Sequence, residues 1–172
     1  MTDKAREIGE LLRAHEARTG RRVTIGTAES ATGGRVANEI TDIHGSSHYF
    51  KGALVAYRND VKIAVLGVRE ETIDIYGAVS AETALEMAEG GRRLLGVDVC
   101  VSDTGIAGPA GATPEKPVGL FYLGLAADNA SMTEKHIFGG GRTENKRAAV
   151  EAALTLLRGF LPKYLSAGDI TE

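Results

Sequence analysis

The stretch that decides the fold is VTIGTAESATGG at residues 23–34, which runs on into RVANEITDI at residues 35–43. Its first seven residues form a short apolar run, which is typical of a buried strand. The Gly33-Gly34 pair then permits a tight turn, and the residues after it have helical spacing. The sequence therefore predicts a strand, a tight turn that carries Ser30, and the beginning of a helix.

The same alternation of strands and helices continues on both sides of this unit. We expect an amphipathic helix before it and, after it, further strands and helices, two of them with caps at Asn59 and Ser80. The expected helices are at residues 3–19, 59–67, 81–96 and 143–161, and the expected strands at residues 50–57, 97–105, 118–128 and 132–138. This order predicts an α/β fold: a three-layer α/β/α sandwich with a mixed, mostly parallel sheet, whose last two strands pair antiparallel.

Composition limits the classes of protein and partner. A chain of 172 residues suits one domain, here expected over residues 1–172. The net charge of −3, with acidic and basic residues interleaved, gives no footprint for nucleic acid. No segment reaches the roughly 18 consecutive apolar residues of a membrane span, and the N-terminus does not read as a leader. We therefore expect a cytoplasmic protein with no membrane partner.

The residues that usually bind metals do not gather in this sequence. The single cysteine, Cys100, lies in the apolar run VDVCVS and is expected to be a buried structural thiol. The four histidines are spread along the chain, with no carboxylate pair at helical spacing beside any of them. We therefore expect no metal site.

Ser30 is the first candidate for chemistry. A hydroxyl on a tight strand-to-helix turn is exposed at the edge of a sheet, and the amides at the helix start point toward negative charge forming beside it. That arrangement suits a nucleophile with an oxyanion hole. From spacing alone, Ser30 or Thr32 fits equally well as a plain helix cap.

Lys62 is the candidate base, because serine is inert at neutral pH without one and no histidine stands in a Gly-rich loop. As a base, a lysine must lose water until its pKa falls from ~10.4 to ~7.5, a cost of roughly 4 kcal/mol. Only a packed site can impose that shift. Spacing alone favours the alternative, a solvated lysine on the surface of a short helix.

Two further Gly-rich segments are candidate anion sites. SDTGIAGP at residues 102–109 offers open amides and the Thr104 hydroxyl, although a tight loop stiffened by proline fits as well. GGGR at residues 139–142 places Arg142 at the start of the last helix. There Arg142 either binds a phosphate together with the helix N-terminus or is simply solvated. Because the Ser30 and Gly105 loops each follow a strand, both are expected to open on one edge of the sheet.

Six segments together resemble the C-terminal domain of the CinA family, also named competence/damage-inducible protein, which includes nicotinamide-nucleotide amidases. In chain order they are TAESATGG, GSSHYF, AYRNDVK, GAVSAE, TGIAGPAGATPEKPVG and FGGGR, within residues 27–147. The resemblance implies hydrolysis of nicotinamide mononucleotide to nicotinate mononucleotide and ammonia, in pyridine-nucleotide recycling, without a cofactor.

The resemblance also implies roles for residues. Ser30 looks like the nucleophile, Lys62 like its base, and Tyr57 like a residue that orients one of them. The implied residues around the substrate are Glu29, Thr32, Gly33, Gly34, Thr104, Gly105 and Arg142. The expected partner is a small nucleotide, and a homo-oligomer, a dimer or larger, is expected as well.

The sequence departs from the family pattern in two places. Many relatives have Cys where this chain has Ala31, a mild change that keeps the turn small. Many have Asp where this chain has Gly141, and the change removes a carboxylate that orients Arg142. The N-terminal domain of two-domain relatives is not in this sequence, so we expect no pyrophosphatase activity.

Two other functions fit the same residues. One is a regulatory module that binds a pyridine nucleotide without turnover. The other is an amidase for a different small amide, which keeps Ser30 and Lys62 and changes the substrate.

Overall fold

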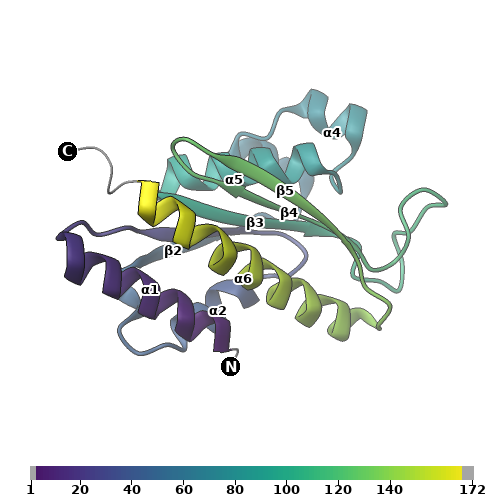
Figure 1. Ribbon diagram of the computed structural model, residues 1–172. Helices are drawn as coiled ribbons and strands as arrows, with labels where there is room; N and C mark the ends of the chain where they lie inside the picture. The colour runs from purple at the N-terminus through teal and green to yellow at the C-terminus, as the bar shows by residue number, and fades with distance from the viewer. Residues whose placement is uncertain (1–2, 168–172) are drawn as a thin grey trace.

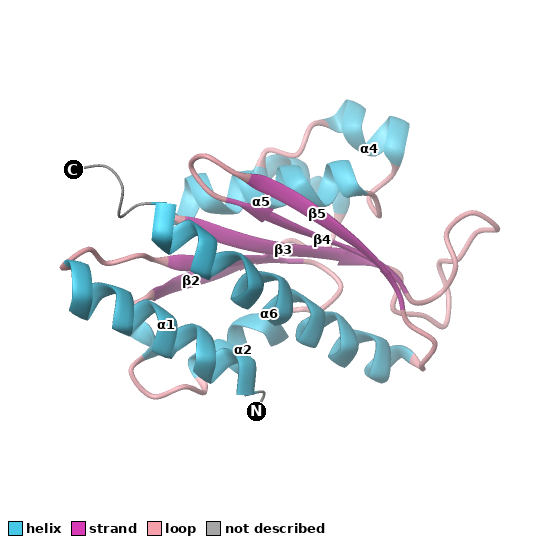
Figure 2. Ribbon diagram, in the orientation of Figure 1, coloured by secondary structure: helices cyan, strands magenta, loops and turns pink. Residues whose placement is uncertain are grey.

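The computed structural model describes residues 3–167 and has helices on both faces of one sheet (Figure 2). The helices are α1 (Asp3–Thr19), α2 (Arg35–Thr41), α3 (Asn59–Val61), α4 (Glu70–Tyr76), α5 (Ala81–Leu95) and α6 (Arg142–Ala167), with a 3-10 helix η1 (Ser46–His48) and a π-helix η2 (Lys62–Leu66). The strands are β1 (Ile25–Glu29), β2 (Phe50–Val55), β3 (Val99–Gly105), β4 (Leu120–Ala126) and β5 (Ser131–Ile137).

The five strands form one open sheet in the order β2-β1-β3-β4-β5. Strand β1 is central to the parallel part, since it pairs in parallel with both β2 and β3. Strand β4 runs antiparallel to β3 and to β5, so β4 alone opposes the direction of the other four. The predicted mixed, mostly parallel sheet with a final antiparallel pair is confirmed.

The sheet lies between two layers of helices (Figure 1). Helices α1, α2 and α6 cover one face, and α5 crosses the other face in contact with all five strands. The larger apolar core lies under α1 and α6 and includes Ile8, Ile25 and Leu157, while a smaller core lies under α5 around Met87. The three-layer α/β/α sandwich is therefore confirmed.

Several local predictions are confirmed. Helix α1 has the predicted bounds, and Ser80 caps α5 by accepting a hydrogen bond from the Thr83 amide. Gly96 ends α5 with a φ of 59°, the left-handed conformation that glycine adopts at little cost. Cys100 is fully buried, and that burial raises the pKa of its thiol to about 12, so it is a structural thiol as expected.

Three details of the helices differ from the predictions. The expected helix at residues 59–67 is a short α3 that continues as the π-helix η2, and Asn59 is its first residue instead of its cap. Helix α4 was not predicted. Helix α6 continues past Pro162 to Ala167, because Tyr164 and Leu165 beyond the proline are buried in the larger core and offset the lost backbone hydrogen bond.

Over residues 3–167, every helix is too short or too polar to cross a lipid bilayer.

Candidate functional site

The site forms where two parallel neighbours, β1 and β3, end at the same edge of the sheet. Thr27 is opposite Val101 and Ala28 is opposite Ser102, so the two strands end side by side. The turn after β1 and the loop after β3 meet there in a pocket of about 180 Å³. Its lining includes Ser30, Tyr57, Asn59, Lys62, Gly105 and Arg142. As expected, the two Gly-rich loops open on one edge.

Ser30 and Lys62 are in direct contact in this pocket. The Lys62 Nζ lies 2.9 Å from the Ser30 Oγ, although the two residues are 32 positions apart in the chain. The amine also lies 2.9 Å from the Ala56 carbonyl oxygen and 3.2 Å from that of Tyr57. Lys62 is 2% exposed and Ser30 is 6% exposed. The solvated lysine that spacing alone favoured is therefore not what the fold produces.

Burial lowers the pKa of Lys62, and the carboxyl group of Asp103 opposes that change. A neutral amine has two hydrogens and one lone pair. In the neutral form the two carbonyl oxygens can accept its two hydrogens, which leaves the lone pair for the hydroxyl hydrogen of Ser30, whereas in the protonated form Lys62 donates to the Ser30 Oγ. This geometry lets Lys62 act as a base toward Ser30.

Lys62 is buried as the first residue of the π-helix η2. A regular short helix with this sequence presents an amphipathic face, and a lysine is expected on the solvent side. In η2 the winding is wider than in an α-helix, and both Lys62 and Leu66 are buried. Gly67 ends the segment with a φ of 73°, and its amide donates to the Ile63 carbonyl oxygen.

Asp103 holds the Ser30 turn in place through hydrogen bonds. The sequence patterns did not single it out. Its carboxyl group accepts hydrogen bonds from the Ser30 amide at 3.2 Å and the Thr32 amide at 3.0 Å, and it contacts the Thr32 hydroxyl. Asp103 is fully buried, and that burial raises its pKa to about 6. The one signal in the sequence was a carboxylate inside the apolar strand before the second Gly-rich loop.

Glu29 and Thr32 lie beneath the turn and do not line the pocket. The Glu29 carboxylate accepts from the Ala37 amide at 2.8 Å and the Val36 amide at 3.1 Å, both in the first turn of α2. It also accepts from the hydroxyl of Thr32 at 2.7 Å. These two side chains fix β1, the turn and α2 to one another, and the fold keeps them out of reach of a bound molecule.

Gly33 and Gly34 shape the turn. Their φ angles are 66° and 88°, in the region where a side chain is strained, so both positions require glycine. Gly34 precedes α2 directly and makes no side-chain cap. Neither Ser30 nor Thr32 caps α2, so that alternative for the two hydroxyls is wrong for this helix.

Thr104 and Gly105 form the opposite wall of the pocket. The Thr104 hydroxyl donates to the Ala78 carbonyl oxygen at 2.6 Å and thereby ties β3 to the segment before α5. A side chain at Gly105 would overlap the ring of Phe121, which explains the glycine. Ala31, which follows Ser30, also lines the pocket, and its amide donates no hydrogen bond within residues 3–167. The Ala31 amide is thus a free backbone donor next to the candidate nucleophile in the chain.

Tyr57 and Arg142 lie at the rim of the pocket. The Tyr57 hydroxyl accepts a hydrogen bond from Arg142 Nη2 at 2.8 Å, and Arg142 Nη1 donates to the Gly108 carbonyl oxygen at 2.8 Å. Tyr57 therefore orients Arg142 through its side chain, while its carbonyl oxygen contacts Lys62. A guanidinium has five N–H groups, so Arg142 keeps donors for an anion at this rim.

Asn59 is a pocket residue that sequence reasoning treated only as a cap. Its amide side chain lines the pocket, is exposed, and makes no hydrogen bond with another residue in the described part of the chain. An amide both donates and accepts, so Asn59 can pair with a polar group of a bound molecule.

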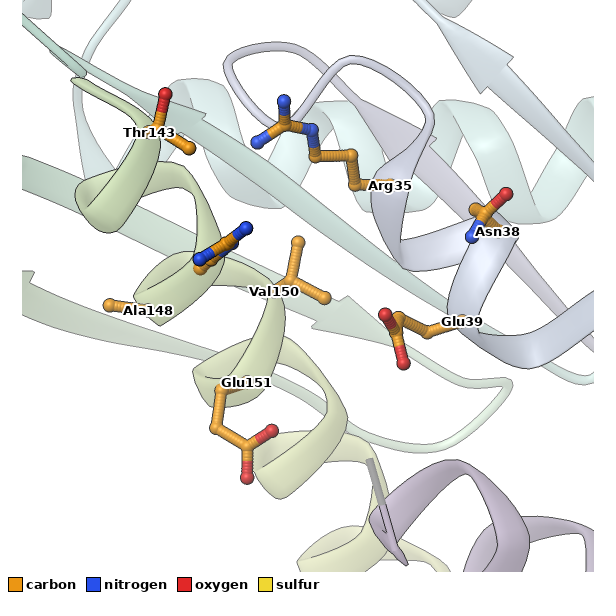
Figure 3. A pocket seen from close by; sticks show the side chains of 8 residues that line it. Arg35, Asn38, Glu39, Thr143, Ala148, Val150 and Glu151 are labelled. Atoms are coloured by element: carbon orange, nitrogen blue, oxygen red, sulfur yellow. The ribbon is translucent and has the colours of Figure 1, made fainter. Parts of the chain in front are cut away.

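A second concave region is larger and differs in character. A groove of about 720 Å³ lies between α2 and the first half of α6, with Arg35, Glu39 and Glu151 around it (Figure 3). It shares no lining residue with the Ser30 pocket. Its only nucleophilic side chain is the hydroxyl of Thr143, an exposed residue. Within residues 3–167, no group of three or more His, Cys, Asp or Glu side chains is arranged to hold a metal ion.

Comparisons with known proteins place the chain in a family. Residues 6–161 match the family model described as CinA C-terminal domain. A putative competence-damage inducible protein of Halothermothrix orenii is 51% identical over 156 residues, which cover 90% of this chain and 36% of that protein. A CinA-like protein of Chloroherpeton thalassium is 48% identical over 158 residues, with the same two shares. The chain thus spans about a third of the length of these curated relatives.

Solved structures agree with the fold. The crystal structure of the competence/damage inducible protein CihA from Agrobacterium tumefaciens matches with a TM-score of 0.79 and 42% identity, over 88% of this chain and 93% of that one. The competence damage-inducible protein A from Klebsiella pneumoniae matches with a TM-score of 0.83 and 29% identity, over 92% and 97% of the two chains.

Proposed function

The chain belongs to the CinA family through its C-terminal domain, and on that premise we propose that it is a serine-dependent amidase. The proposed reaction is hydrolysis of the carboxamide of nicotinamide mononucleotide to nicotinate mononucleotide and ammonia. The observation that carries the proposal is the buried amine of Lys62, 2.9 Å from the Ser30 hydroxyl oxygen at the wall of a small pocket.

The proposed mechanism has two halves. The Ser30 Oγ attacks the amide carbon while Lys62 takes the hydroxyl proton, which gives a tetrahedral intermediate with a negative oxygen. Lys62 then returns the proton to the nitrogen, the C–N bond breaks, and ammonia leaves an ester on Ser30. A water molecule, deprotonated by Lys62, attacks that ester, and the proton goes back to the Ser30 oxygen as the carboxylic acid departs.

The Ala31 amide is the proposed donor to the negative oxygen. The Ser30 and Thr32 amides are directed at Asp103 and are therefore occupied. Loss of one such donor in other enzymes costs about 3 kcal/mol of transition-state stabilisation. The Ser30 and Thr32 amides thus hold the turn, and the Ala31 amide remains available for the proposed role.

The size of the pocket supports a substrate that is only partly enclosed. Pockets for whole drug-sized ligands usually hold about 300–1,000 Å³, whereas this one holds about 180 Å³. An aromatic ring with its carboxamide fits such a space, and the ribose phosphate then extends over the rim. Arg142 lies at that rim and is the proposed partner of the phosphate.

The proposal is tested by ammonia release from nicotinamide mononucleotide. We expect turnover by the wild type and none above background by Ser30→Ala, because the variant lacks the hydroxyl that forms the ester in the proposed mechanism. Ser47→Ala is the matched control, since Ser47 is exposed and lies far from the pocket in the fold. Equal turnover by Ser30→Ala and the wild type would contradict the mechanism.

The same assay separates the two other functions. Nicotinamide, its riboside and its mononucleotide share the carboxamide, and only the last has a phosphate. Preference for the mononucleotide supports the proposed substrate, whereas turnover of a different small amide alone assigns another substrate. Binding of the mononucleotide without ammonia release by the wild type assigns a regulatory binding module.

A further inference from the structure

Thr32 lies between two buried carboxyl groups. Its Oγ1 is 2.7 Å from Glu29 Oε2 and also contacts Asp103 Oδ2. Thr32 and Asp103 are 0% exposed and Glu29 is 1% exposed, so solvent does not separate them. A hydroxyl has one hydrogen and can donate it to only one of the two acids. Were both acids ionised, the second would face the lone pairs of the hydroxyl oxygen with no hydrogen between them, which is costly in a buried site.

The remaining hydrogen bonds indicate which acid is ionised. Glu29 accepts from the hydroxyl of Thr27 at 3.1 Å and from the amides of Val36 and Ala37. Several donors to a carboxylate favour its charged form. Asp103 accepts from two amides, and one of these, from Ser30, is long at 3.2 Å. The charge is therefore better accommodated on Glu29 and the proton on Asp103.

We propose that Asp103 is a positioning residue that keeps a proton while the enzyme works. In this arrangement the Asp103 hydroxyl donates to the Thr32 oxygen, the Thr32 hydroxyl donates to Glu29, and Asp103 still accepts the two amides of the Ser30 turn. The connection between this proton and catalysis rests on the proposed function. The assignment of protons to Glu29, Thr32 and Asp103 does not.

The proton matters because of Lys62. A negative Asp103 raises the pKa of Lys62 and so opposes the neutral amine that a base requires. When Asp103 is neutral, it does not oppose the lowering of the Lys62 pKa by burial. The other charged groups near the turn are Glu29 from β1 and two side chains of α6, Arg142 in the pocket and Lys146 beside Gly33.

The pKa of Asp103 is shifted in the direction of this assignment, and a value of about 6 by itself leaves the group mostly ionised at neutral pH. Burial raises it to about 6, even though the Thr32 hydroxyl and the two amides lower it when they donate to the carboxylate. Once the Thr32 hydrogen goes to Glu29, its lowering influence is lost and the pKa of Asp103 rises further. The negative charge of Glu29 raises it as well.

The first experiment tests whether Asp103 carries a proton, and it does not depend on catalysis. Infrared spectra of the Ser30→Ala protein at neutral pH are compared with and without the additional change Asp103→Asn. Asn keeps the shape and the acceptor oxygen and has no acidic proton. We expect a band of a protonated carboxylic acid that Asp103→Asn removes and that Asp74→Asn, a change of an exposed acid, leaves in place. If the spectrum of Ser30→Ala has no such band, the proposal is wrong.

The second experiment measures the pKa of Lys62 by NMR of labelled lysine. We expect Asp103→Asn to leave that pKa within about 0.3 of its value in the parent protein, because a neutral group replaces a neutral group. A fall of about one pKa unit or more would mean that a negative charge was removed, and would overturn the proposal. Neither experiment needs catalysis, so failure of the proposed reaction and failure of this inference are distinguishable.

The third experiment uses Thr32. Thr32→Ser keeps the hydroxyl and is expected to retain kcat within about threefold, whereas Thr32→Val removes it and is expected to lower kcat more than about tenfold with little change in KM. Melting temperatures of both variants establish that the proteins are folded. Equal kcat values for Thr32→Val and Thr32→Ser would contradict a role for the hydroxyl bridge.

Discussion

Two concave regions of this molecule, the Ser30 pocket and the groove between α2 and α6, differ in how far their charged groups are exposed to solvent. The groove between α2 and α6 is about four times as large as the Ser30 pocket, and Arg35 and Arg147 on its walls are exposed to solvent. Its Glu151 forms an ion pair with Lys4. In the small pocket the amine of Lys62 is buried and directed at a hydroxyl. Exclusion of water, and not the size of the cavity, is what changes the chemistry of a charged group.

The largest effect is expected for Lys62. Lys62→Met fills the same space and removes the base, so we expect kcat for ammonia release to fall by roughly 10³-fold or more. The matched control is Lys163→Met, which changes an exposed lysine on α6 and should leave kcat unchanged. Kinetic constants and melting temperatures are measured for both. A fall of less than tenfold in Lys62→Met would show that the buried amine is not the base.

The next effect concerns stability and Asp103. Its pKa in the folded protein, about 6, lies above the ordinary value of 3.8. The folded state therefore binds the proton more tightly than the unfolded state, and the free energy of unfolding falls as pH rises through this interval. The expected fall is on the order of 3 kcal/mol, at about 1.36 kcal/mol per pKa unit.

Asp103→Asn should lack that fall, since it cannot ionise. Denaturant unfolding of the wild type and the variant is measured at several pH values from about 4 upward. The difference between the two proteins should change through about pH 6, and should continue to change at higher pH if Asp103 keeps its proton as proposed. A constant difference across the range would show that Asp103 has the same pKa in both states.

A smaller effect is expected at the rim of the pocket. Arg142→Ala removes a charge-assisted hydrogen-bond donor worth about 1.5–3 kcal/mol, so KM for nicotinamide mononucleotide should rise by about 10- to 100-fold. The riboside, which has no phosphate, should be nearly unaffected. Equal losses for the two substrates would place the phosphate elsewhere.

The smallest effect is expected in the large groove. Arg35→Ala and Arg147→Ala change exposed side chains that do not touch the Ser30 pocket, so kcat and KM should stay within about twofold of the wild type. These variants are the counterpart of Arg142→Ala, because each removes one arginine. A loss of tenfold or more in either would mean that the substrate extends into the groove.

Much of the fold was predictable from local patterns. The bounds of α1, the cap of α5 at Ser80 and the alternation of strands with helices follow from spacing and capping residues near one another in the chain. Helix α6 was predicted to end too early, because the burial that carries it past Pro162 depends on distant core residues. Rules based on neighbouring residues take account of Pro162 and not of the core residues that pack against the helix beyond it.

The candidate site was predictable only in part. Ser30 and the Gly33-Gly34 turn were readable from the sequence, since a strand, two glycines and a helix follow one another. The partner of Ser30 was less so, because spacing alone favoured a solvated Lys62. Asp103 and the amide of Asn59 were missed, since a carboxylate inside an apolar strand is a weak signal and nothing local marks the amide of Asn59 as part of a site.

The sequence by itself determined the order of the elements, the two glycine turns and the edge of the sheet at which they open. Tertiary structure alone decided which charged groups lost their water. Desolvation depends on every atom packed around a group, and Lys62 and Asp103 each contact the Ser30 turn, which lies dozens of residues away in the chain. For that reason an ordinary lysine and an ordinary aspartate became the unusual groups of this protein.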